Sequence, residues 1–302
     1  MGSETVRRWW RVARDAAEHW LQHNAFSHAG ALAFYTLFSL APVFVIAVAV
    51  IGVVFGEDAA RGQIVAQLQD LIGHEAASAV EQAVARSRIQ ESGLWPSVLG
   101  VATLLVGATT VFGQMQFSLN SIWGVAARPS RSSVFVFVKN RLLSLTVVLS
   151  IGFVLLVSLL LGVVLRAVLR FTQYFVPAVA SLLSGAEVLV SFVAMALLFC
   201  AIFKVLPDVM LRWRDVLVGA LVTAALFSVG RYGIAAYLAY TATASTYGAA
   251  GSVVLVLLWV YYSSLILLYG AAFTKTQLLA RGGRIVPRNS AVRVHQQLVT
   301  DA

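Results

Sequence analysis

The sequence predicts an all-α, polytopic membrane protein with six transmembrane helices and additional amphipathic surface helices. Of its 302 residues, 60% are apolar and only 12% are charged, against roughly 25% charged in a soluble domain. Several stretches without a charged residue exceed the about 20 residues that a helix needs to cross a bilayer. A water-soluble fold of this size is therefore disfavoured. The first apolar run, 28 residues long, is also too long for the core of a secretory signal.

The uncharged runs define six expected spans. Four runs of 24 to 43 residues each exceed the length of a span. Two shorter runs of 15 and 16 residues reach that length only if a flanking charged side chain snorkels or lies within the membrane. The expected spans are 29–55, 96–119, 142–165, 187–206, 216–239 and 252–273.

The basic residues predict the orientation of these spans. With both termini on one side, the segments on that side hold 16 of the 22 Lys and Arg residues. Basic loops prefer the cytoplasmic face, so both termini are expected in the cytoplasm. The formal charge of +9 is thus interpreted as a consequence of topology. It predicts anionic phospholipids and the lipid bilayer as partners, and no nucleic acid.

Segments outside the spans are expected to include amphipathic helices. Residues 1–28 form a cytoplasmic N-terminal helix with a stripe through Val6, Trp10, Ala13, Ala17 and Leu21, and either the membrane surface or the helix bundle could receive this stripe. Residues 57–92 form an outer helical loop. The basic cytoplasmic tail, 275–302, is expected to be disordered.

Polar residues in or beside the spans are candidates for a substrate or ion path. Arg231 lies within the fifth span if that helix continues past it, and an ionisable residue there is a functional-site candidate. Glu187 is a plausible partner, and the alternative is that Arg231 snorkels at the interface. The candidates that could line a cytoplasmic vestibule or bond across helices are Gln114, Gln116, Asn120, Asn140 and Arg141. Tyr35 and Ser39 are further candidates in the first span, where a kink at Pro42 could shape a cavity or improve packing.

Other residues are expected to shape or pack the helices. Proline in a span removes a backbone donor and kinks the helix, and glycine lets neighbouring backbones approach closely. The residues expected in these roles are Pro42, Gly248, Gly251, Trp259 and Gly270.

The sequence contains no recognisable catalytic motif. The five histidines lack metal-ligand spacing, no phosphate-binding loop of the GxxxxGK[ST] type occurs, and Cys200, the single cysteine, excludes an intramolecular disulfide. The protein is therefore not expected to be an enzyme or to bind a metal ion or another cofactor.

Four stretches of the chain form a characteristic set: HNAFSHAGALAFYTLFSLAPVFVIAVAVIGVVFG, QLQDLIGHEAASAVEQAV, LNSIW and YGAAGSVVLVLLWVYYSSLILLYGAAF. Together they resemble the YihY/BrkB family of bacterial inner-membrane proteins over about residues 15 to 280. The resemblance implies six spans, cytoplasmic termini and a plasma-membrane location. Many members look like Gly-Ala-Glu at a point where this chain reads Gly270, Ala271 and Ala272.

Three functions are candidates. The preferred hypothesis is a transporter or flippase-like exporter of an envelope lipid or another anionic, amphipathic solute, which agrees with links to envelope-lipid export in some relatives. The first alternative is a non-transporting membrane protein, either a scaffold or an envelope-integrity or virulence factor. The second is a tRNA-processing ribonuclease of the BN type, a label that the family has carried. The absence of a soluble catalytic domain disfavours the ribonuclease, and a homo-oligomer remains open.

Overall fold

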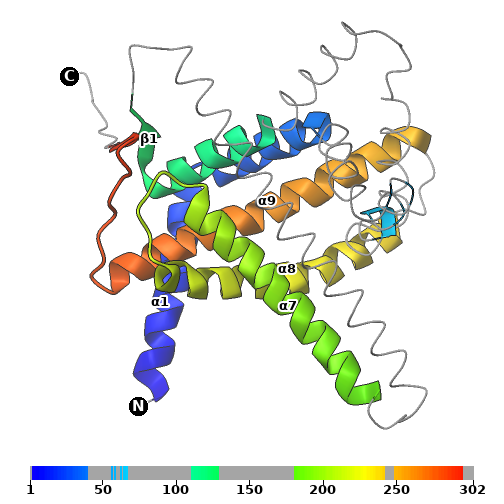
Figure 1. The fold of residues 1–302 in the computed structure, drawn as a ribbon, viewed down its shortest axis with the longest axis horizontal. Coiled ribbons are helices and arrows are strands. Elements are labelled where there is room, and N and C mark those ends of the chain that lie inside the picture. Colours follow the sequence, from blue (N-terminus) through cyan, green and yellow to red (C-terminus); the bar gives the residue numbers. More distant parts are fainter. Residues whose placement is uncertain are drawn as a thin grey trace, which may run out of the picture.

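The computed structural model describes a mostly helical protein (Figure 1). The structure describes residues 2–39, 56, 58, 62, 64–66, 110–128, 180–241 and 248–294. Within these ranges only the backbone is described for residues 2–5, 180–188, 190, 234–241, 248–253 and 255. The labelled helices are α1 (Gly2–Gln22), α7 (Ala180–Val205), α8 (Trp213–Thr241) and α9 (Gly248–Ala280). Residues 25–39 and 110–123 are also helical.

Helix α9 runs through the middle of the arrangement. In Figure 1 the helical residues 25–39 and 110–123 run along one side of α9, and α8 runs along the other. Helix α7 packs on α8, α8 packs on α9, and α1 packs on α9. Helix α1 crosses α9 at a steep angle, and its N-terminal half projects away from the other helices (Figure 1).

Small residues bring α8 and α9 into close contact. A Cβ atom on Gly219 would lie 2.9 Å from Thr274 Cβ, and one on Gly270 would lie 3.0 Å from Thr223 Cβ. Each threonine hydroxyl donates to the carbonyl four residues earlier on its own helix, so both buried hydroxyls are satisfied. Close approach through small residues is the usual packing mode of membrane helices, because lipid offers no hydrophobic drive for helix association.

Apolar side chains also face outward. Helix α7 exposes Leu189, Val193 and Leu197, and α8 exposes a similar stripe that includes Leu217 and Val229. Among the described residues, two segments are long and apolar enough to cross a membrane, Trp213–Gly233 and Val256–Ala280, and the apolar segment Ser191–Val205 is shorter. Exposed apolar faces on such helices suit a hydrocarbon solvent.

The described helices can be compared with the six expected spans. Helices α7, α8 and α9 cover the positions of the last three. The first two are described only up to residue 39 and from residue 110, while the third, and most of the loop 57–92, lie outside the described residues. The six-span count therefore stays a prediction.

The prediction of a disordered tail is wrong for residues 281–294. Strand β2 (Ala291–Arg293) pairs antiparallel with β1 (Val125–Ala127), and Val125 lies opposite Arg293. Two further backbone bonds, from Arg128 N to Ser290 O at 2.8 Å and from Val294 N to Gly124 O at 3.0 Å, extend the pairing. The tail is ordered because its backbone groups find partners in another segment. The fold consequently contains a small two-stranded sheet beside its helices.

Two expected boundaries also change. Helix α9 continues to Ala280 rather than ending at residue 273, so Lys275 is a helical residue. The single N-terminal helix expected over 1–28 is divided, because α1 ends at Gln22 and the chain turns at Asn24, whose φ of 50° is left-handed. Asparagine tolerates that conformation better than most residues.

Candidate functional site

Four segments meet at one end of the bundle. They are the second half of α1, the end of the helix 110–123 with β1, the loop 206–212 between α7 and α8, and residues 275–294. We call this end the junction. The helix 110–123 ends here because Gly124 adopts a left-handed φ of 68°, and its N–H donates to Ser121 O at 3.0 Å.

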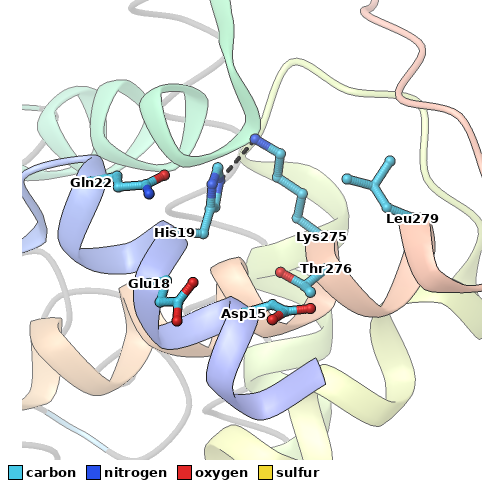
Figure 2. A pocket seen from close by; sticks show the side chains of 7 residues that line it. All are labelled: Asp15, Glu18, His19, Gln22, Lys275, Thr276 and Leu279. Atoms are coloured by element: carbon cyan, nitrogen blue, oxygen red, sulfur yellow. Dashed lines mark hydrogen bonds between the residues drawn. The ribbon is translucent and has the colours of Figure 1, made fainter. Parts of the chain in front are cut away.

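Lys275 joins three of these segments. It is only 8% exposed, and Nζ donates to Ile122 O at 2.8 Å. Nζ also lies 2.8 Å from His19 Nε2, a contact that Figure 2 shows. Ile122 O belongs to the last turn of its helix, where the carbonyls lack intrahelical partners and the helix dipole is negative. The ammonium of α9 thus caps a second helix while it contacts α1.

His19 is neutral in this arrangement. Burial is the main reason that its pKa falls to about 4; the contact with the Ile122 carbonyl opposes the shift, and the Lys275 ammonium adds to it. His19 Nε2 lies 2.9 Å from Ile122 O and 2.8 Å from Lys275 Nζ, so it can donate to the carbonyl in one tautomer or accept from the ammonium in the other. The ring of His23 lies 3.9 Å away, centroid to centroid, and burial lowers its pKa as well.

Asp208 organises a second polar cluster. Its Oδ2 accepts from Asn120 Nδ2 at 2.8 Å and from Gln116 Nε2 at 3.1 Å. Its backbone N–H donates to Asn120 Oδ1 at 2.8 Å, so Asn120 and Asp208 are bonded reciprocally. Arg288 N donates to Asp208 O at 2.8 Å, which attaches the C-terminal segment to the same loop. The carboxylate is therefore held by two side-chain amides, while the Asp208 backbone is held by Asn120 and Arg288.

Several buried N–H donors at the junction have no acceptor within the described part of the chain. They are Trp20 Nε1, Trp123 Nε1 and Gln277 Nε2. Trp123 is 1% exposed and Gln277 is 3% exposed. A buried donor without a partner costs about 1–3 kcal/mol, so these groups favour an added acceptor.

A pocket of about 360 Å³ opens beside Lys275 and His19 (Figure 2). In Figure 2 the carboxylates of Asp15 and Glu18 lie on the opposite side of His19 from the Lys275 ammonium. Glu18 also pairs with Arg14 at 2.9 Å. The remaining lining residues are Gln22, Thr276 and Leu279. Among the described side chains, no group of three or more His, Cys, Asp and Glu residues could hold a metal ion.

The structure brings some of the predicted path residues together. Gln116 and Asn120 meet at Asp208, whereas Gln114 bonds Ser118 at 3.4 Å on another face of the same helix. Ser118 in turn contacts His28 at 3.2 Å. The polar face of the helix 110–123 is thus divided between two neighbours.

Other predicted path residues lie away from the junction. Tyr35 is exposed, and Ser39 is buried with its hydroxyl donating to Thr36 O at 3.2 Å. Arg231 is half-buried and contacts the next residue, with its Nη2 donating to Tyr232 OH at 3.3 Å. Helix α8 continues past Arg231 to Thr241, and Arg231 lies about 27 Å along the axis from Trp213. Because the helix continues past it, Arg231 lies within the expected fifth span, 216–239, and its role in a substrate or ion path stays a prediction.

The predicted packing residues are described in part. Trp259 is buried and packs edge-on against Phe227, with centroids 5.9 Å apart. Gly270 contacts Thr223 and Phe203. The positions Gly248 and Gly251 lie at the start of α9. The residues or side chains outside the described part of the chain are Pro42, Asn140, Arg141 and Glu187.

Sequence reasoning misses the residues at the centre of the junction. It places Lys275 in the tail, because a lysine after an apolar run usually ends a span. His19 stands out in the sequence only for its spacing from His23. The sequence does contain a signal for Asp208, which lies beside Pro207 in a short loop. This loop is expected on the same side of the membrane as the amides of Gln116 and Asn120, which are four residues apart on one helix face.

Comparisons with known proteins identify relatives over most of the chain. The family model described as "Virulence factor BrkB" matches residues 16–293. A UPF0761 membrane protein of Chromobacterium violaceum is 29% identical over 274 residues, which cover 89% of this chain and 62% of the relative. One of Mannheimia succiniciproducens is 26% identical over 259 residues, which cover 84% of each protein. The chain spans about three fifths of the length of several of these relatives. No solved structure matches it.

Proposed function

The chain belongs to the BrkB family of membrane proteins, and from that premise we propose that it is an exporter or flippase of the bacterial inner membrane for an anionic, amphipathic envelope component. In this proposal the junction faces the cytoplasm. The support is the distribution of basic residues, 16 of 22 of which belong to the segments on the side of the termini. The proposal includes no catalytic step.

The surplus of buried hydrogen-bond donors at the junction carries this proposal. Lys275 brings a buried ammonium whose bonds go to a carbonyl and a neutral imidazole. Trp123 Nε1 and Gln277 Nε2 add donors without an acceptor in the described part of the chain. The oxygens of a phosphate or carboxylate headgroup would supply both the missing acceptors and a counter-charge. An anionic headgroup is therefore the ligand class that fits best.

The apolar faces of the helices suit the other half of such a substrate. Leu189 and Leu197 on α7 and Leu217 on α8 are exposed, so these two helices offer apolar surface to the lipid. Acyl chains can remain against such faces while only the headgroup contacts polar groups. An amphipathic substrate would thus keep its apolar part in lipid.

A flipping assay in reconstituted liposomes tests the proposal. We expect labelled phosphatidylglycerol to cross faster than labelled phosphatidylcholine in vesicles that contain the protein. Lys275→Met removes a charge-assisted bond of about 1.5–3 kcal/mol, so it should slow phosphatidylglycerol flipping by roughly tenfold or more. Arg281→Met, which removes an exposed charge just past the same helix, is the matched control and should flip at the wild-type rate.

A second variant separates loss of function from loss of folding. Trp123→Phe keeps an aromatic ring in the core but removes the unpartnered Nε1 donor. If the donor serves a headgroup, this variant stays folded in thermal unfolding and flips phosphatidylglycerol more slowly. Equal rates for both lipids in the wild type, unchanged by Lys275→Met, would contradict the proposal and favour a non-transporting scaffold.

A further inference from the structure

Helix α1 is only half covered by the other described residues. In its second half, Val12 and Ala16 are buried with Phe273, and Tyr269 OH donates to Ala13 O at 3.2 Å. In its first half, Val6 is 68% exposed and Trp10 is 74% exposed. The projecting half therefore presents large apolar side chains that the described part of the fold does not cover.

The exposed side chains belong to the amphipathic stripe of α1. At 100° per residue, Val12 and Ala16 lie on one face of the helix, whereas Val6, Trp10 and Leu21 lie on the adjacent edge. All three of these edge residues are exposed. The bundle therefore receives the face beside the stripe and partly covers Ala13 and Ala17, and it leaves the large side chains of the stripe uncovered.

The basic residues occupy the next edge of the same helix. Arg7 and Arg11 are exposed and follow the apolar edge around the helix axis. Arg8 donates to Ala280 O at 3.4 Å, and Arg14 pairs with Glu18. Residues 2–14 contain four arginines and one acidic residue, Glu4, so this half carries a net positive charge. The projecting half thus combines an apolar edge with a positively charged edge.

The position of α1 places these edges at the end of a membrane-spanning segment. Helix α1 contacts α9 near Phe273, towards the end of the apolar segment Val256–Ala280. It crosses α9 steeply (Figure 1). When α9 crosses a bilayer, α1 consequently runs along the bilayer surface, at the depth where tryptophan is favoured.

We propose that the projecting half of α1 docks onto the anionic lipid surface next to the junction. Val6 and Trp10 enter the boundary between headgroups and acyl chains, and Arg7 and Arg11 contact lipid phosphates. An edge of apolar residues beside an edge of arginines is the arrangement by which interfacial helices bind anionic membranes. This inference does not depend on transport activity.

Spin labelling of the full chain in lipid nanodiscs tests this docking. Cys200 is the single cysteine and is buried, so Cys200→Ser with Trp10→Cys gives one labelled site. In discs containing phosphatidylglycerol we expect the label to collide with oxygen, which concentrates in lipid, rather than with a water-soluble nickel complex. Each arginine near an anionic surface strengthens membrane binding about fivefold. Replacing both Arg7 and Arg11 by Gln should therefore lower the ratio of membrane-immersed to water-exposed label roughly 30-fold.

Three outcomes would overturn the inference. A label at residue 10 that collides with the nickel complex in every disc would show a helix in water. Dipolar broadening between labels would show that a second copy covers the edge. Equal immersion in phosphatidylcholine discs would remove the role of the arginines. Arg284→Gln, a change at an exposed tail arginine, is the matched control and should leave the immersion unchanged, and Val6→Cys provides a second labelled site if Trp10→Cys expresses poorly.

Discussion

The contact between Gly219 and Thr274 permits a sharp test of how α8 and α9 pack. In Gly219→Ala the new methyl group would meet the Thr274 hydroxyl, and it would lie 2.9 Å from Thr274 Cβ and 3.3 Å from Thr274 Cα. Because a backbone atom is among the contacts, a side-chain rotation cannot relieve the crowding, and the two helices must separate. Overpacking of this kind costs about 1–3 kcal/mol, and the higher helix propensity of alanine returns up to about 1 kcal/mol.

Gly233→Ala is the matched control on the same helix. Nothing lies within 4 Å of a Cβ at Gly233, so this variant keeps the gain in helix propensity without the crowding. The two variants should therefore differ by about 1–3 kcal/mol in the free energy of unfolding, measured by equilibrium unfolding in mixed detergent micelles. Adding Thr274→Ala to Gly219→Ala should recover part of the loss. If Gly219→Ala is as stable as Gly233→Ala, the described α8–α9 packing is wrong.

Three further predictions concern the junction. The pKa of His19 is about 4 in the folded protein against an ordinary value of 6.5. The unfolded chain therefore binds the proton first, and the free energy of unfolding falls as the pH drops from about 6.5 through about 4. Thermal unfolding across this range should show a smaller loss of stability in His19→Gln than in the wild type. Asn120→Ala leaves the Asp208 backbone N–H without its acceptor, which should cost about 1–3 kcal/mol in the same micelle titration. Val294→Pro removes the donor to Gly124 O, costs about 1 kcal/mol, and should speed trypsin cleavage of the C-terminal segment in a proteolysis time course.

Each of these predictions has a clear contrary result. An identical pH dependence in His19→Gln and the wild type would mean that other groups set the acid limit. An Asn120→Ala protein of unchanged stability would show that water replaces the amide at no cost. Unchanged cleavage in Val294→Pro would mean that the strand pairing of β1 and β2 does not protect the tail.

The helices are predictable from sequence where local patterns decide them. The fifth span is expected at 216–239, and α8 covers Trp213–Thr241, because a long apolar stretch favours a helix even where it contains one charged residue, Arg231. The start of α8 lies a few residues earlier than expected, since Asp215 in its first turn reaches back and accepts from Arg212 N at 2.9 Å. Local composition is thus sufficient for the position of a helix and less so for its ends.

The junction is not predictable in the same way. Lys275 looks like the first residue of a tail, yet its ammonium reaches Ile122 O, 153 residues away in the chain. Likewise, Asn120 finds Asp208 at a separation of 88 residues. Such partners depend on how distant segments pack, which no periodicity along the chain records. Strand β2 is not predictable from local sequence either, because its partner β1 lies more than 150 residues earlier in the chain.

The ratio of flipping rates for phosphatidylglycerol and phosphatidylcholine, measured in the same reconstituted vesicles, tests whether the junction selects an anionic headgroup. A headgroup site built on the Lys275 ammonium and buried N–H donors favours the anionic lipid, because a charged acceptor gains most from these donors. We expect a ratio well above one for the wild type and a value near one for Lys275→Met. A wild-type ratio near one would contradict it.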